Sequence, residues 1–160
     1  MPMGDNVGQV DHVVMMVRSE NLDASVSRLS ELLEIQFEYF EAPRQGVKGA
    51  LSADSMLEYI APLGDGSPAS DSLTRLLDEK GEGIHSITFG VADARATKER
   101  LDVIGVRSRE VYDAINEDAP AFMHERFDTT LECHLRERVA GTLFVLSQIE
   151  RKEERSGGDV

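Results

Sequence analysis

The sequence has a single cysteine, no tryptophan and no long apolar run. With Cys133 alone, no disulfide can form within the chain, which favours a reducing compartment. No apolar run approaches the roughly 20 residues that a helix needs to cross a bilayer. The N-terminus shows no basic stretch followed by an apolar core, so we expect no signal peptide. These absences together predict a cytoplasmic protein that has no membrane partner.

Basic residues are also scarce, with 17 Lys and Arg against 30 Asp and Glu and a net charge of −13. Such a chain repels phosphate backbones, which excludes nucleic acid as a partner and disfavours anionic membrane surfaces. What the chain does have is enough apolar sequence, 41% of 160 residues, for the core of one domain.

The order of strand and helix signals is the main evidence for the fold, because it occurs twice. The first copy, residues 7–61, opens with an apolar, β-branched run at 10–17. A helix capped by Ser19 follows, and then three short strand candidates at 35–41, 47–52 and 56–61. Proline and glycine at 62–68 mark a connection, and we expect a connecting helix at 71–80.

The second copy, residues 84–136, repeats this order. A strand run at 84–91 leads to a helix that begins after Asp93 and ends near Ile104. The strand candidates that follow it are 106–111, 121–125 and 130–135. The role of segment 137–150 stays open, since its run at 142–149 fits an extra strand or a short helix. The tail 151–160 is charged and then glycine-rich, and we expect it to be flexible.

Equal spacing supports an internal repeat. Glu58 follows His12 by 46 residues, and Glu132 follows Ser86 by the same number. The sequences around the two glutamates are also similar, with DSMLE at 54–58 and DTTLE at 128–132. We therefore predict a single α+β domain, 1–160, in which two βαβββ modules curl around a shared cavity.

His12, Glu58, Ser86 and Glu132 would occupy equivalent places in such a cavity. An imidazole and two carboxylates that converge in an apolar cup suit a divalent metal ion, and carboxylates buried without a cation would carry a large desolvation cost. The alternative is a hydrogen-bonded core histidine with glutamates at solvated strand ends.

Two segments resemble a known superfamily. VDHV at 10–13 and LLDEKGEGIHSITFGV at 76–91 are similar to the vicinal oxygen chelate proteins, which include glyoxalases, extradiol dioxygenases, epimerases and antibiotic-resistance proteins. The resemblance is strongest to the methylmalonyl-CoA epimerase-like branch. It implies a glyoxalase-like half-barrel cup, a homodimer and a divalent metal, with His12, Glu58, Ser86 and Glu132 at the four ligand positions.

The chain departs from this branch at its metal-ligand positions. Ser86 stands where the resemblance implies a histidine, and the preceding His85 is predicted to point to the other strand face. A second alignment places Val145 rather than Glu132 at the fourth ligand position. With His12, Glu58 and Glu132 as the remaining ligands, we expect a divalent ion (Mn, Co, Ni, Zn or Fe) to be weakly held or absent.

The chain also departs at the catalytic base. Gly49 stands where the resemblance implies a carboxylate, so we expect no appreciable methylmalonyl-CoA epimerase activity. Glu58, Glu132 and His134 are the candidate acid–base groups, and His134 follows Glu132 by one pleat.

The expected function is therefore a small-molecule lyase or isomerase of the vicinal oxygen chelate type with a degenerate metal site, acting on an oxygenated or acyl-thioester substrate. The alternative is a protein of the same fold that binds or sequesters a small molecule without chemistry. A ring-cleaving dioxygenase fits least, since one of its two histidine positions is unfilled. Tyr39, Arg44 and Arg107 are further candidates for contact with an anionic ligand.

Overall fold

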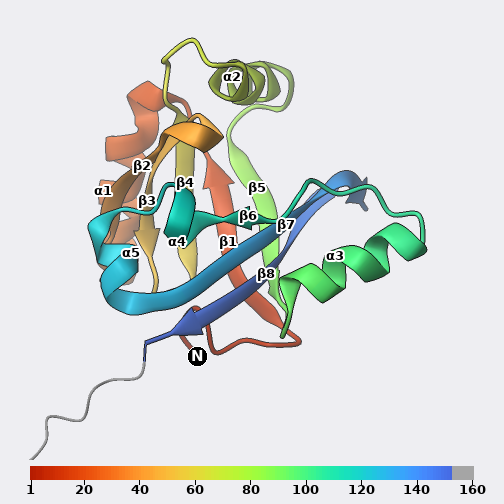
Figure 1. Ribbon diagram of the computed structural model, residues 1–160. Helices are drawn as coiled ribbons and strands as arrows, with labels where there is room; N and C mark the ends of the chain where they lie inside the picture. The colour runs from red at the N-terminus through yellow and green to blue at the C-terminus, as the bar shows by residue number, and fades with distance from the viewer. Residues whose placement is uncertain (153–160) are drawn as a thin grey trace, which may run out of the picture.

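The centre of the computed structural model, which describes residues 1–152, is one mixed sheet of eight strands (Figure 1). Its spatial order is β2-β3-β4-β1-β5-β8-β7-β6. The strands are β1 (Val10–Met16), β2 (Glu38–Ala42), β3 (Val47–Ser52), β4 (Leu57–Pro62), β5 (Gly83–Gly90), β6 (Tyr112–Asp113), β7 (Phe127–Val139) and β8 (Thr142–Arg151). β1 and β5 pair antiparallel at the centre, β4 lies parallel to β1, and β8 lies parallel to β5. The order is thus symmetric about the β1–β5 pair.

Each half of the sheet comes from one βαβββ module, so the predicted α+β glyoxalase-like architecture is confirmed. The first module contains β1, α1 (Leu22–Leu33) and β2 to β4, and the second contains β5, α3 (Ala94–Val103) and β6 to β8. The helix α2 (Pro68–Lys80) connects them. The second module extends further than expected, because the open segment at 142–149 is β8, its last strand.

Two expected strands of the second module differ. Residues 121–125 fall in a helix, α5 (Ala121–Arg126), which follows the short helix α4 (Ala114–Glu117). This segment contains no β-branched residue and follows Pro120, which suits the N-terminus of a helix. The strand expected at 106–111 is absent apart from an isolated bridge at Ser108, and the short strand β6 begins only at Tyr112. Of the predicted tail, Arg151 ends β8, and 153–160 lie outside the described residues.

Local sequence fixes where the helices begin. The side chain of Ser67 accepts a hydrogen bond from the backbone of Ser70 at the start of α2, and Asp93 does the same for α3. Ser19 does not cap α1 directly. It lies in a 3₁₀ turn, η1 (Ser19–Asn21), and its hydroxyl donates to the Pro62 carbonyl. A second 3₁₀ turn, η2 (Pro43–Gln45), separates β2 from β3. None of the helices within residues 1–152 has the length and apolarity required to cross a membrane.

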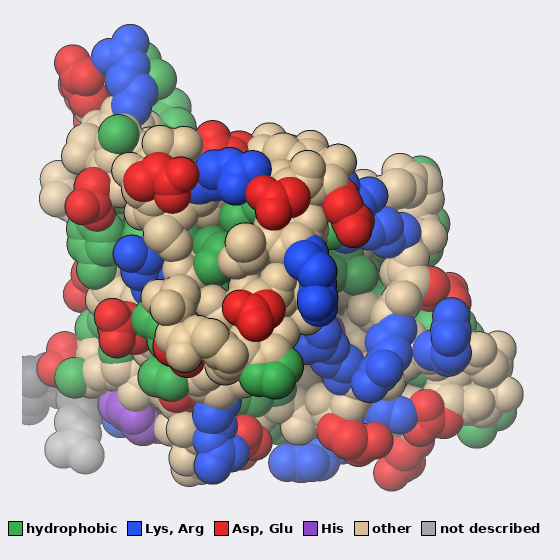
Figure 2. Space-filling model, turned by 90° about the horizontal axis from the view of Figure 1, so that it is seen from above, with side chains coloured by type: hydrophobic (Ala, Val, Ile, Leu, Met, Phe, Trp, Pro, Cys, Tyr) green, Lys and Arg blue, Asp and Glu red, His purple; other side chains and the backbone are tan. Residues whose placement is uncertain are grey.

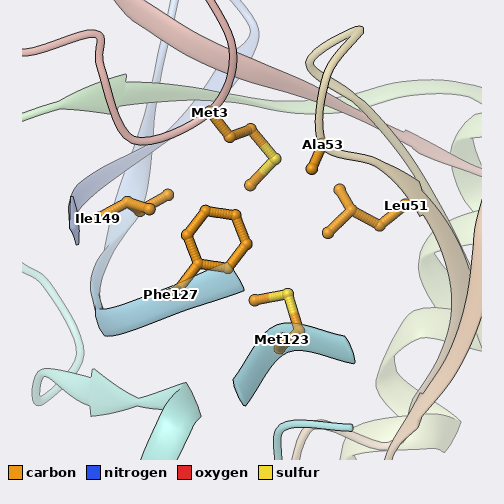
Figure 3. Packing of buried hydrophobic residues seen from close by; sticks show 6 residues of the cluster. All are labelled: Met3, Leu51, Ala53, Met123, Phe127 and Ile149. Atoms are coloured by element: carbon orange, nitrogen blue, oxygen red, sulfur yellow. The ribbon is translucent and has the colours of Figure 1, made fainter. Parts of the chain in front are cut away.

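One apolar cluster explains why the sheet curls. Phe127 at the start of β7 is 1% exposed and packs with Leu51 of β3, although these strands lie near opposite ends of the sheet order. Met123 of α5, Met3, Ala53 and Ile149 complete the cluster around the Phe127 ring (Figure 3). Contact between β3 and β7 brings the outer strands of the two modules together, and this turns the sheet into a cup.

Candidate functional site

The cup encloses a cavity of about 510 Å³ whose walls come from both modules. Every residue that the sequence singled out as a candidate ligand or acid–base group lines it. These are His12, Glu58, Ser86, Glu132 and His134, together with Val145 from the second alignment. One cavity therefore collects all the predicted metal-ligand and acid–base residues, whereas Tyr39, Arg44 and Arg107 do not line it.

The central strands pair around a local two-fold axis. His12 of β1 lies opposite Thr88 of β5, and Val14 lies opposite Ser86. This register makes Ser86 the equivalent of His12 and Thr88 the equivalent of Val14. The register of these two strands is thus consistent with the repeat offset read from the sequence.

The outer strands do not keep that offset. Val14 pairs with Glu58 on β4, whereas its equivalent Thr88 pairs with Val145 on β8. The strand register therefore gives the place equivalent to Glu58 to Val145, as in the second alignment. Glu132 lies on the neighbouring strand β7, opposite Ser147. Its role as a metal ligand stays a prediction that would require it to reach the ion from a different strand.

Glu132 has another counterpart. In the first module, Gly49 of β3 pairs with Ile60, which is two residues beyond Glu58 on β4. In the second module, Glu132 of β7 pairs with Ser147, which is two residues beyond Val145 on β8. Glu132 is thus the two-fold equivalent of Gly49. The carboxylate is present in the second module at the place where the first module has lost a side chain.

No side chain can be added simply at Gly49. A Cβ there would overlap the Tyr59 carbonyl oxygen and would lie 2.7 Å from Cζ of Phe40, its partner on β2. The Phe40 ring lines the cavity and occupies the space in front of Gly49. An aromatic ring thus stands where the resemblance implies a catalytic carboxylate.

His12 lies between two carboxylates. Its Nδ1 is 2.8 Å from Oδ1 of Asp11 and its Nε2 is 3.3 Å from Oε2 of Glu58. Burial opposes a positive charge on His12, but the hydrogen bonds to Asp11 and Glu58 outweigh it and raise the pKa to about 9. At neutral pH the ring is an imidazolium, whose Nε2–H points toward Glu58.

The N-terminal segment holds Asp11 in place. The Gly4 backbone N–H donates to Oδ2 of Asp11 at 2.9 Å, and Asn6 Nδ2 lies 3.5 Å from the same oxygen. Burial raises the pKa of Asp11, but the hydrogen bond from His12 and that from Gly4 lower it overall. Asp11 is therefore a buried carboxylate that fixes the orientation of the His12 ring.

A second histidine–carboxylate pair lines the same cavity. His134 Nε2 lies 2.9 Å from Oε2 of Glu132, and both side chains are about one-fifth exposed. Burial raises the pKa of Glu132, but the hydrogen bond from His134 and the charges of His134 and His12 lower it overall. Tyr112 of β6 lies opposite Glu132, and burial together with nearby carboxylates raises the pKa of its phenol.

A β-bulge in β5 alters the direction of His85. Ser86 pairs with Val14 and Ile84 with Met15, so His85 is an extra residue on its strand. His85 lines the cavity, and the expectation that it points to the opposite face is wrong. Burial and then the charges of Arg138, His134 and Arg109 lower its pKa to about 4. Its Nδ1 is buried and has no hydrogen-bond partner within residues 1–152.

The donor set does not fit a four-ligand metal site. Of the four equivalent places, His12 and Glu58 carry donors suited to a transition metal, Ser86 offers only a hydroxyl, and Val145 offers none. Throughout the part of the chain that the structure describes, no three His, Cys, Asp or Glu side chains are grouped to hold an ion. A weakly held divalent ion at His12, Glu58 and Glu132 stays a prediction, and no chemical step below depends on one.

The arginines in the cavity wall are not those that the sequence suggested. Arg44 is ion-paired with Glu117, and Arg107 lines a separate shallow recess. The cavity is lined instead by Arg109 and Arg138. Arg109 lies in the segment 106–111 that was expected to be a strand, and Arg138 lies in 137–150, whose role stayed open, so the sequence did not single out either side chain.

The curled eight-stranded sheet of two βαβββ modules is the fold of the vicinal oxygen chelate proteins, and the chain has this glyoxalase-like fold. Among solved structures, the methylmalonyl-CoA epimerase of Mycobacterium tuberculosis superposes with a TM-score of 0.68 at 21% identity, over 99% of this chain and 97% of that one. A Streptomyces coelicolor methylmalonyl-CoA epimerase variant in complex with 2-nitronate-propionyl-CoA gives 0.65 at 22%, over 88% and 96%. A hypothetical protein from Bacillus halodurans C-125 gives 0.68 at 22%, over 93% and 98%.

Sequence comparison adds no closer relative. No family model matches the chain, and no curated protein matches its sequence significantly. At about one-fifth identity, the structural likeness establishes the fold and leaves the activity to be argued from the cavity.

Proposed function

We propose that the protein is a lyase or isomerase that acts on a small oxygenated or acyl-thioester compound inside this cavity. The observation that carries the proposal is that two histidine–carboxylate pairs, one from each module, face a single cavity. Charged pairs buried in an apolar cup are costly to maintain for stability alone. They are typical of acid–base sites.

The two pairs differ in the roles that they can take. Glu132 is the candidate base, because hydrogen bonding to His134 keeps its carboxylate ionised at neutral pH. His12 is the candidate oxyanion partner. Its Nε2–H lies 3.3 Å from Glu58, a long contact that leaves the proton free to be shared with a substrate carbonyl oxygen. Proton removal at Glu132 and charge stabilisation at His12 would together support an enolate-like intermediate.

The cavity is poorly suited to methylmalonyl-CoA epimerisation itself. Epimerisation moves a proton between two faces of one carbon and therefore needs acid–base groups on both sides. The first-module place is closed by Gly49 and the Phe40 ring, whereas its two-fold equivalent Glu132 is present. We therefore favour a reaction that needs one base.

A deuterium-exchange assay tests the proposal. The protein is incubated in D₂O with a panel of short acyl-CoA thioesters that includes methylmalonyl-CoA, and deuterium at the α-carbon is measured by mass spectrometry. We expect exchange above the buffer rate for at least one member and a loss of about 10²–10⁴-fold in Glu132→Gln. The control is Glu125→Gln, an exposed glutamate of α5 that does not line the cavity. No exchange with any member, or equal loss in both variants, would refute the enzyme proposal.

The alternative, a binding protein without chemistry, is favoured by one specific observation. Ser86, Val145 and Phe40 replace or block groups that the resemblance assigns to metal binding and catalysis, while the cavity keeps its volume. Native mass spectrometry of the protein purified without chelators discriminates between the two. A stoichiometric small molecule that survives unchanged, combined with no exchange activity, would support binding alone.

We also propose that the protein is a homodimer. Large apolar side chains are exposed at the C-terminal ends of α1 and α3, namely Leu32, Leu33, Val103 and Ile104, and exposed apolar surface is a common sign of an interface. Light scattering should give twice the chain mass of 17.7 kDa at micromolar concentration. A monomer mass would contradict this proposal and leave the cavity chemistry unaffected.

A further inference from the structure

A group of basic side chains forms one end of the cavity. It consists of His85, Arg109, His134 and Arg138, which all line the cavity wall, and we call it the cationic cluster. The chain path brings its members together, because the Arg109 backbone N–H donates to the His134 carbonyl at 2.8 Å. Arg138 Nη1 donates to the Gly141 carbonyl at 3.2 Å, which ties its side chain to the β7–β8 turn. The second module therefore gathers four basic groups around one part of the cavity.

His134 of the cluster is paired with Glu132, but the two arginines have no carboxylate partner among the described residues. Within residues 1–152, the arginines with a carboxylate partner within 4 Å are Arg18, Arg28, Arg44, Arg126 and Arg151. Arg109 and Arg138 are not among them, and both are exposed at the cavity rim. In a chain of net charge −13, this is a local reversal of sign. Seen from the side of α2, Lys and Arg side chains gather on one half of the face (Figure 2).

The interior of the cluster contains an unused polar atom. Nδ1 of His85 is buried and no described group accepts or donates a hydrogen bond there. A buried polar atom without a partner costs about 1–3 kcal/mol, and such a cost is recovered when a ligand supplies the missing partner. His85, which lines the cavity, therefore keeps a ring nitrogen that a bound molecule could partner.

We propose that the cationic cluster binds an anionic oxygen group, a carboxylate or a phosphate, of the molecule that occupies the cavity. The guanidinium groups of Arg109 and Arg138 present paired N–H donors that match either anion, and His85 in the same cavity wall has an unpartnered ring nitrogen. The inference concerns binding, and it stands whether the cavity catalyses or only binds.

Thermal unfolding followed by circular dichroism tests this proposal with three probes at constant ionic strength. The probes are malonate, inorganic phosphate and malonamide, which is the neutral analogue of malonate. An anion that binds the native state raises the melting temperature in a concentration-dependent way. We expect at least one of the two anions to stabilise the protein and malonamide to have no effect. Stabilisation by malonate alone assigns a carboxylate source, and stabilisation by phosphate alone assigns a phosphate source.

Two variants and a matched control locate the site. Arg109→Gln and Arg138→Gln should each weaken the apparent anion affinity by about tenfold. Arg136→Gln removes the same charge two residues away on β7, from an exposed side chain that lines the separate recess and not this cavity, and it should preserve the affinity. Equal weakening in Arg136→Gln and Arg138→Gln, or no stabilisation by either anion, would overturn the proposal. A shift of the His85 imidazole NMR signal on adding the anion, assigned through His85→Gln, provides a second readout that does not depend on activity.

Discussion

The two modules place histidine in opposite electrostatic environments within one cavity. His12 of the first module lies between Asp11 and Glu58, which raise its pKa to about 9 against the effect of burial. His85 of the second module is partly buried, and this burial together with the charges of Arg138, His134 and Arg109 lowers its pKa to about 4. At neutral pH one ring is charged and the other is neutral.

This difference arises from single residues on a shared backbone frame. Strands β1 and β5 pair symmetrically, and each has one register shift at equivalent places, at Asp11 in β1 and at His85 in β5. At this place the first module has the carboxylate that holds His12, whereas the second module has an imidazole. The repeat thus determines where the backbone lies, and substitutions at equivalent positions determine the charge of each half. This explanation is tested by substitutions that make the two modules more alike, or that remove the groups paired with a histidine in one module.

The largest expected effect concerns the metal positions. Ser86→His combined with Val145→Glu would give the second module the two donors that the first module has in His12 and Glu58. We expect the affinity for Mn²⁺, Co²⁺ or Zn²⁺, measured by calorimetry, to rise by roughly 100-fold or more. Even residues that only support metal ligands are worth about 10–100-fold, and here two ligands are added.

Single variants distinguish the two alignments of the fourth ligand. Ser86→His alone should gain little if Val145 occupies the fourth place, and the gain of the double variant should survive Glu132→Ala. If Ser86→His alone gains the full affinity and Glu132→Ala removes it, Glu132 is the ligand, and the equivalence of Val145 with Glu58 does not govern metal binding.

The next largest effect is on stability. Asp11→Asn would leave the buried His12 charge without its closest partner and weaken the hydrogen bond from Gly4. Breaking one side of a buried pair costs about 3–5 kcal/mol of unfolding free energy. Urea unfolding followed by circular dichroism measures this, since the chain has no tryptophan for fluorescence. The control is Asp78→Asn, an exposed partner of Arg18, which should cost about 0–1 kcal/mol. Similar losses in both variants would contradict a special role for Asp11.

The sequence was sufficient to predict the architecture because element type and order survive where single positions do not. The runs at 10–17 and 84–91, each followed by a capped helix, predicted the central strands and the repeat. The last strands were harder to place. The similar sequences at 54–58 and 128–132 do not lie in equivalent strands, because the first runs into β4 and the second lies in β7. The offset of 74 residues between the modules therefore holds only as far as the helix of each module. Insertion of α4 and α5 between β6 and β7 explains the shift.

The candidate site could be predicted only where it depends on strand alternation. Alternation predicted that His12 and Glu58 face the cavity, and they do. It failed at His85, because a bulge breaks the two-residue period and a bulge is set by pairing with a partner strand. Arg109 and Arg138 gave no periodic signal, since the first precedes a two-residue strand and the second lies beyond a register shift in β7.

A smaller effect is expected at alkaline pH, from His12. Its folded-state pKa of about 9 exceeds the ordinary value of 6.5, so the native protein holds more protons than the unfolded chain between these values. The stabilisation is complete below pH 6.5 and is lost as the pH rises through 9. We expect the free energy of unfolding to fall by about 1–3 kcal/mol over this range, since one pKa unit amounts to about 1.4 kcal/mol. In His12→Gln this fall should disappear after subtraction of the common baseline, and a parallel pH profile in the variant would contradict the assignment.

The smallest effect is expected at acidic pH, from His85, and it has the opposite sign. Its folded-state pKa of about 4 lies below 6.5, so the unfolded chain takes up a proton first as the pH falls. Stability should therefore decrease between pH 6.5 and 4. Because His85 is only partly buried, solvent screening makes the change smaller than that from His12. His85→Gln should flatten this part of the pH profile, whereas His124→Gln, at an exposed position on α5, should leave it unchanged. If the slope between pH 6.5 and 4 is the same in wild type and His85→Gln, the second-module histidine does not experience the surrounding cations, and the electrostatic contrast between the two halves of the cavity is lost.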